Sequence, residues 1–177
     1  MTQKEQICNS ALLLIGTQGL SSFEDGSAGA ELAKAFFDLT YQSMLTESRW
    51  HFATRQQELV QIAGTTNYQL PQDCLYVVNS TVNPYEIYER TILTDTNQIP
   101  TIEYIFEPDL QNVPPYFIQA LEFKLAAKFA IPLTEDATKT STYTALYQQE
   151  VKKAKYLDST SRTVDIIPMG AYIGVRH

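Results

Sequence analysis

The chain changes character at Ser48-Arg49-Trp50-His51-Phe52-Ala53. Before this stretch, apolar residues recur at the spacing of an α-helix. After it come short runs that are rich in Val, Ile, Thr and Tyr and are separated by turn residues. Trp50 and Phe52 alternate as side chains do along a strand, and we expect them to cover the end of a helix pair. The stretch therefore marks the boundary between a helical part and a β part.

Helical periodicity recurs on both sides of the β part, and it predicts four helices, at about residues 2–15, 28–47, 115–131 and 135–157. Thr2 and Glu5 form a possible capping box at the first start, and Ser27 can cap the second helix. Pro115 suits the first turn of the third helix, and Pro132 is expected to end it. Apolar residues cover most sides of this third helix, which indicates the central helix of the core.

The middle of the chain carries short segments with strand composition, at residues 54–62, 67–70, 74–82, 85–88, 91–94 and 101–106. Gly64, Pro71 and Asn83-Pro84 are among the turn residues that separate them. We therefore predict an α+β fold that is mainly α. Its core is a four-helix bundle with an inserted antiparallel β-hairpin or small sheet, at about residues 54–106. Residues 1–158 are expected to form a single domain.

The last segment, residues 159–177, is predicted to be an extended C-terminal docking tail. It is too short and too interrupted by Pro and Gly to form a core, yet it is more apolar than an ordinary solvated terminus. A soluble protein rarely leaves such a surface uncovered. We expect docking on a partner or on a neighbouring copy of the chain, through Val164, Ile166, Ile167, Met169, Tyr172, Ile173 and Val175.

Composition narrows the class of protein. The chain has 177 residues, of which 44% are hydrophobic, so a packed core is expected. Its net charge of −7 argues against a protein that binds DNA through its phosphates. Cys8 and Cys74 are expected to be reduced, buried thiols. The first residues contain no apolar signal-like run, and no stretch approaches the ~18 apolar residues of a membrane span. We expect a protein of cytoplasm-like surroundings, or one carried within an assembly.

The sequence offers little support for a metal site or a catalytic site. Glu47 and His51 could share a helix face, but two ligands do not make a metal site. No nucleophile motif or phosphate-binding glycine loop is present. Three carboxylate pairs could be proposed as glycosidase acids, although solvated faces and turns explain them better: Glu24 with Asp25, Glu86 with Glu89, and Glu103 with Glu107. We therefore expect no catalytic residue, no metal, no cofactor and no enzymatic activity.

Tyrosine is abundant, with 11 in the chain. Core packing accounts for about half of them, because tyrosine buries a large area while keeping a polar tip. Tyr85, Tyr88 and Tyr104 lie on expected hairpins, where both faces cannot be buried. A surface role in assembly is predicted for this group.

Several strings occur in a recognisable order: Asp25-Gly26-Ser27, Trp50-His51-Phe52-Ala53, Leu70-Pro71-Gln72-Asp73-Cys74-Leu75, Tyr85-Glu86-Ile87, Ile92-Leu93-Thr94 and Pro132-Leu133-Thr134. Together they resemble the tail tubular protein A family, the head-to-tail adaptors (connectors) of short-tailed bacteriophages. The similarity covers about residues 5–157. One departure concerns the hairpin turn, where the family often has glycine and this chain has Glu89.

The resemblance implies a structural virion protein at the head–tail junction, assembled in the host cytoplasm. Its copies would form a ring of about twelve (a dodecamer) that joins the portal protein to the tail nozzle protein. DNA would pass through the lumen without specific binding, and no membrane is involved. The residues of the family strings would then be scaffold: Trp50, Phe52, Leu70, Pro71, Asp73, Cys74 and Leu75. Two alternatives remain at this point, a virion-associated peptidoglycan-degrading enzyme and a generic interaction module unrelated to phage.

Overall fold

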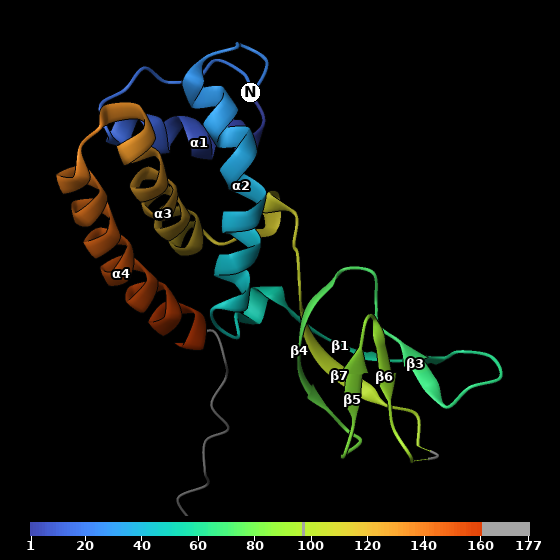
Figure 1. Cartoon of the computed structure of the whole chain (residues 1–177). Helices are drawn as coiled ribbons and strands as arrows, with labels where there is room; N and C mark the ends of the chain where they lie inside the picture. Colours follow the sequence, from blue (N-terminus) through green and yellow to red (C-terminus); the bar gives the residue numbers. More distant parts are fainter. Residues whose placement is uncertain (97, 161–177) are drawn as a thin grey trace, which may run out of the picture.

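The computed structural model describes residues 1–96 and 98–160, and Figure 1 shows how their elements are arranged. Four α-helices form a helical body: α1 (Gln3–Leu14), α2 (Ala28–Thr46), α3 (Pro115–Thr134) and α4 (Ala137–Thr160). Two short 3₁₀ helices accompany them, η1 (His51–Ala53) and η2 (Leu110–Asn112). The ends of all four α-helices lie within about three residues of the predicted positions.

Seven strands form a β module beside the helical body (Figure 1). They are β1 (Thr54–Glu58), β2 (Val60–Gln61), β3 (Asn67–Gln69), β4 (Cys74–Ser80), β5 (Glu86–Tyr88), β6 (Thr91–Leu93) and β7 (Thr101–Phe106). The strands make two antiparallel sheets, one with the order β1-β7-β4 and the other with the order β2-β3-β6-β5. Strand β7 is thus paired on both edges, although it is the last strand in sequence.

The three-stranded sheet is the middle layer of the molecule. Side chains alternate between the two faces of a strand. Accordingly, Tyr104 and Phe106 of β7 belong to a core shared with the second sheet, whereas Ile105 belongs to the core of the helical body. Strand β4 divides in the same way, with Cys74 in the sheet core and Leu75 packed against the helical core. The middle sheet therefore links two hydrophobic cores.

This architecture corrects the predicted fold class. The described residues form four α-helices and two antiparallel sheets with seven strands, so the fold is not a four-helix bundle core with a small inserted hairpin. The predicted β segments are real strands, but they build a second core around Leu59, Tyr68 and Ile92. The prediction failed because strand composition is local, whereas the pairing of β1 with β7 joins residues about 50 positions apart in sequence.

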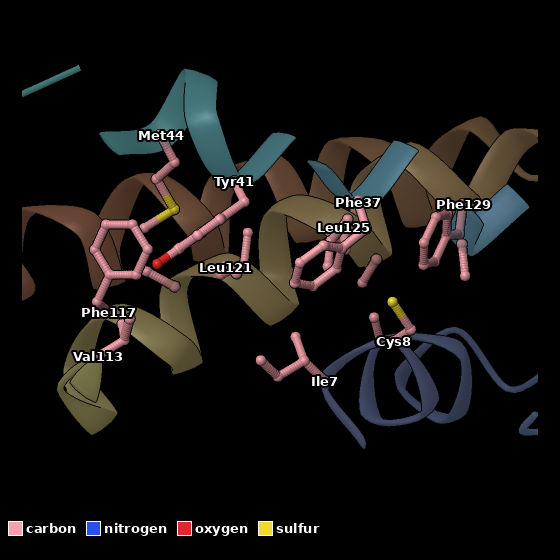
Figure 2. Packing of buried hydrophobic residues seen from close by; sticks show 14 of the residues in the cluster. Ile7, Cys8, Phe37, Tyr41, Met44, Val113, Phe117, Leu121, Leu125 and Phe129 are labelled. Carbon is pink, nitrogen blue, oxygen red and sulfur yellow. The ribbon is translucent and has the colours of Figure 1, made fainter. Parts of the chain in front are cut away.

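Helix α3 is the centre of the helical body. Its side chains Phe117, Leu121, Leu125 and Phe129 are fully buried among residues of α1 and α2. Figure 2 shows this packing from close by, with Ile7 and Cys8 of α1 on one side of α3 and residues of α2 on the other. The central position predicted for this helix is confirmed. It follows from the apolar residues that surround the helix on most sides.

Local signals at the helix ends gave mixed outcomes. The capping box of Thr2 and Glu5 is formed, and the Ser27 side chain accepts a hydrogen bond from the Ala30 amide, as predicted. Pro132 does not end α3, which continues to Thr134, where Glu135 turns the chain in a left-handed conformation. Proline here removes one backbone donor in the last turn, and the helix tolerates that loss.

The segment Trp50-His51-Phe52-Ala53 does not begin a strand, because residues 51–53 form η1. The strand interpretation of the Trp50 and Phe52 alternation is therefore wrong, and β1 begins only at Thr54. Within the described ranges, no helix is long and apolar enough to cross a membrane. The predicted docking residues Val164, Ile166, Ile167, Met169, Tyr172, Ile173 and Val175 lie outside the described residues.

Candidate interaction site

The segment that joins the helical body to the β module is tightly packed. Trp50 is fully buried, and its Nε1 donates a hydrogen bond to the Met44 carbonyl oxygen at 3.1 Å. Its ring meets Phe117 edge-on, with centroids 5.1 Å apart and an interplanar angle of 85°. Phe52 makes a similar edge contact with Phe117, also at 5.1 Å. Two residues of the family strings thus anchor η1 to the first turn of α3.

A second contact at the same joint comes from Asp158, in the last turns of α4. One carboxylate oxygen accepts a hydrogen bond from the His51 amide and also lies 2.9 Å from His51 Nδ1. The other oxygen accepts a hydrogen bond from the Tyr116 hydroxyl at 2.9 Å. Asp158 is only 3% exposed, so this buried carboxylate is satisfied by three partners from η1 and α3. Burial, together with the bond to Asp158, raises the pKa of Tyr116.

The second family string, residues 70–75, forms the turn between β3 and β4. Asp73 accepts hydrogen bonds from Arg55 at 3.0 Å and from the Tyr104 hydroxyl at 3.2 Å. Arg90 donates to the Pro71 and Gln72 carbonyl oxygens from the neighbouring hairpin. Leu70 and Cys74 are buried in the sheet core, and Leu75 packs against the helical core. Each residue of the string therefore has a structural contact within the chain, and Leu75 links the string to the helical body.

A cleft of about 910 Å³ lies between the start of α1, α2 and the segments 72–75 and 107–111. Its polar side chains bond largely to one another. Lys4 pairs with Asp38 at 2.7 Å, Gln42 donates to Glu107 at 2.8 Å, and the Tyr41 hydroxyl donates to the Pro108 carbonyl oxygen at 2.8 Å. The first of these bonds joins α1 to α2, whereas the other two join α2 to the segment that follows β7.

The two cysteines are separated, one in each core. Cys8 is fully buried in the helical body, where burial raises the pKa of its thiol to about 12. Cys74 lies in the sheet core, and burial raises its pKa as well. Since the thiolate is the reactive form, both thiols are unsuited to nucleophilic chemistry. The prediction of reduced, buried thiols is confirmed.

The candidate catalytic and metal-binding residues do not form a reactive site in the described part of the chain. His51 pairs with Asp158, while Glu47 contacts Lys124 and Tyr147, so these two do not act together as ligands. In the described ranges, no group of three or more potential metal ligands occurs. No hydrogen bond joins His51 to a serine, threonine or cysteine in the same ranges.

The three carboxylate pairs have other contacts. Asp25 accepts hydrogen bonds from the amides of Ser21 and Ser27 before α2, while its neighbour Glu24 lies near Lys34 at 3.3 Å. Glu103 pairs with Arg49, and Glu107 bonds Gln42. The remaining pair, Glu86 and Glu89, is exposed at the β5–β6 hairpin.

Exposed apolar side chains mark the surface of the β module. Tyr88 is 69% exposed, and Val60, Tyr76 and Ile87 are also exposed. Among the tyrosines singled out from the sequence, Tyr104 is buried and Tyr85 is half-buried against the sheet core. Only Tyr88 of that group is fully available for contact with another molecule, and it lies on the edge strand β5.

Sequence reasoning missed two features of the site. Asp158 follows Tyr147, Val151 and Ala154 on the inward face of α4, so an acidic residue at an expected core position was the available signal. The second feature is the free edge of β5. It can be recognised only from the order of strands in the sheet, for which the sequence contains no local signal. A scan of the sequence against models of known protein families finds no match, and a comparison with curated proteins finds none either.

Proposed function

We propose that this chain is a structural adaptor that assembles into a ring at the head–tail junction of a short-tailed phage. In this role it joins the portal to the tail nozzle, and its action is binding without catalysis. The proposal rests on one observation, the structural contacts that the residues of the family strings make within the fold. Trp50 and Phe52 anchor the segment that leads into β1 to Phe117 of α3. Leu75 of β4 packs against the helical core, and Asp73 ties β1 to β7 within the β module.

A rigid joint of this kind suits an assembly protein. A ring subunit has to present several contact surfaces at fixed angles, and binding surfaces are held best by packed elements. The β module extends from the helical body, and its exposed apolar residues are typical of surfaces that meet another protein (Figure 1). The buried and hydrogen-bonded joint favours this role over that of an enzyme, whose reactive groups lie in a cleft.

Charge supports the proposed passage of DNA. Residues 54–111 contain eight acidic and only two basic residues, so the β module is strongly negative. A surface of this sign repels DNA phosphates and lets a duplex slide past without sticking. We expect the isolated protein to bind duplex DNA at physiological salt with a dissociation constant of roughly 10⁻⁴ M or weaker.

The test uses the whole protein and the portal encoded in the same genome. The two are mixed, and the mass and symmetry of the product are measured by native mass spectrometry and by electron microscopy. We expect a closed ring of about twelve copies on each portal. Trp50→Ala, which loosens the joint, should reduce attachment, whereas the exposed Leu39→Ala serves as a control. A well-folded wild-type chain that neither attaches to the portal nor forms rings on it would refute the proposal.

Enzymatic activity is tested separately on purified peptidoglycan. We expect no turnover. Robust turnover that is abolished by Glu24→Gln or Glu103→Gln, with the fold intact, would establish the enzyme alternative instead.

A further inference from the structure

Two exposed surfaces of the chain carry opposite charge. The first, here called the acidic edge, consists of Glu86, Ile87, Tyr88, Glu89 and Asp95. The first three lie on β5, Glu89 lies in the turn after it, and Asp95 follows β6. Among the described strands β5 pairs only with β6, and so it forms one edge of the four-stranded sheet. Ile87 and Tyr88 are exposed apolar residues, and Asp95 lines the same small hollow as Glu86. Within the described ranges, its three carboxylates form no ion pair.

The second surface, the lysine face, lies on the last turns of α4 and consists of Lys152, Lys153, Lys155 and Tyr156. All four residues are exposed, and Tyr156 is 68% exposed. The opposite side of this part of the helix carries Ala154 and Asp158, which are buried against the helical body. The lysine face therefore points away from η1 and hence away from the β module that follows η1.

The two surfaces cannot meet within one chain. In Figure 1, α4 runs along the outer side of the helical body, while β5 lies in the β module on the other side of α2. Contact between an acidic edge and a lysine face therefore requires two copies. Because the two surfaces differ, such contacts are head-to-tail, and they close into a ring when the rotation between copies permits.

We propose that the acidic edge of one copy docks on the lysine face of the next, and that this contact is the subunit interface of the ring. The inference rests on the proposed function, because it names the partner of the exposed β surface. Tyr88, which shares one face of β5 with Glu86, lies against Tyr156 of the next copy as the apolar centre of the interface. The carboxylates of the edge surround this centre and face the lysines, in the usual order of an apolar core and a polar rim.

Charge gives the contact its direction. Edge against edge would place carboxylates together, and face against face would place lysines together, and both like-charge arrangements are unfavourable. Only the unlike pairing brings opposite charges together. The same complementarity speeds encounter between copies and makes it dependent on salt.

The test reverses each surface separately. One variant carries Lys152→Glu and Lys153→Glu, and the other carries Glu86→Lys and Glu89→Lys. A control, Glu24→Lys with Glu31→Lys, has the same net charge as the second variant but changes exposed residues at the start of α2. Self-association of the full chain without portal is followed by sedimentation velocity at an ionic strength of about 50 mM, where exposed charges are little screened. Circular dichroism establishes that every variant is folded.

We expect the wild type and the control to associate, and each reversed variant to associate at least about tenfold more weakly. An equimolar mixture of the two reversed variants should regain the wild-type affinity, because each then offers its partner an unlike surface. Full association of either reversed variant, failure of the mixture to recover, or a wild type that stays monomeric would each overturn the proposal. Portal attachment is measured separately, so loss of the interface and loss of the adaptor function are distinguishable. If the lysine reversal abolishes portal attachment and leaves self-association unchanged, the lysine face belongs to the portal contact and the proposal fails.

Discussion

The helical body and the β module are built on different principles. In the helical body, α3 is enclosed by the other helices, and its large side chains such as Phe117 and Phe129 are completely buried. In the β module, the strands are short and several large apolar side chains, including Val60 and Tyr88, remain exposed. The comparison indicates a division of labour, in which the helical body provides stability and the β module provides contact surface.

The middle sheet explains how the two regions coexist. One of its faces packs against the helices and the other against the second sheet, so it is covered on both sides. Among the described elements, none pairs with the outer edges of β2 and β5, which are the edge strands of the second sheet. Exposed edges invite pairing with other chains unless charges guard them, and Glu86 and Glu89 are placed to do so at β5.

The strongest contrast should come from truncating one aromatic residue in each region. Phe117→Ala removes the ring that contacts Trp50, Phe52 and Tyr41, and we expect it to lower the free energy of unfolding by about 3–5 kcal/mol. Tyr88→Ala should change it by less than about 0.5 kcal/mol. Denaturant unfolding measures both. Equal losses of unfolding free energy in the two variants would contradict the assignment of stability to the helical body and of contact surface to the β module.

The next largest effect concerns the joint. Asp158→Ala leaves the His51 amide and the Tyr116 hydroxyl without their acceptor, and we expect a loss of about 1–3 kcal/mol. Amide exchange should quicken in the last turns of α4. The control Glu150→Ala removes only an exposed contact with Lys153 and should have little effect. If Asp158→Ala is as stable as this control, the carboxylate does not hold α4 to η1.

A smaller effect is expected at two non-glycine residues with left-handed backbone, Glu89 in the β5–β6 hairpin and Glu135 after α3, both with φ of 53°. Glycine adopts this conformation without steric cost. Glu89→Gly and Glu135→Gly should each stabilise the chain by up to about 1 kcal/mol. The family resemblance placed glycine at the first of these turns. Destabilisation by Glu89→Gly in thermal unfolding would show that the glutamate side chain supports the hairpin.

The smallest predicted effect is a dependence on acid pH, and it belongs to the helical body. Hydrogen bonds from Ser27 and then Ser21 hold the pKa of Asp25 below its ordinary value. A carboxyl group with a lowered pKa stabilises the fold above its unfolded pKa, about 3.9, and loses that contribution as the pH falls through the folded value. Unfolding between about pH 2 and 5 should be less pH-dependent in Asp25→Asn than in the wild type. An unchanged pH profile would contradict this assignment.

The helices were predictable because their signals are local. Three of the helix starts are marked directly, by Thr2 with Glu5, by Ser27 and by Pro115. The apolar periodicity predicts how far the helices extend. The strands were also recognised one by one from composition and turns. Their arrangement was not, because the placement of β7 between β1 and β4 depends on contacts between residues far apart in sequence.

The site shows the same limit. Trp50 and Asp73 were singled out from the sequence, and both have structural contacts, Trp50 at the joint and Asp73 between strands of the β module. The roles of His51 and Asp158 were missed, because these residues lie 107 positions apart and meet only through the fold. The acidic edge could be found only once β5 was known to be an edge strand.

One measurement tests the central claim most directly, namely oxidative footprinting of tyrosine side chains in the free chain and in the ring on its portal. The account predicts that the exposed Tyr88 and Tyr156 react in the free chain and become protected in the ring. The buried Tyr41 and Tyr104 should remain unreactive in both, as internal controls. Continued reactivity of Tyr88 in an assembled ring would contradict the assignment of the β module as the contact surface.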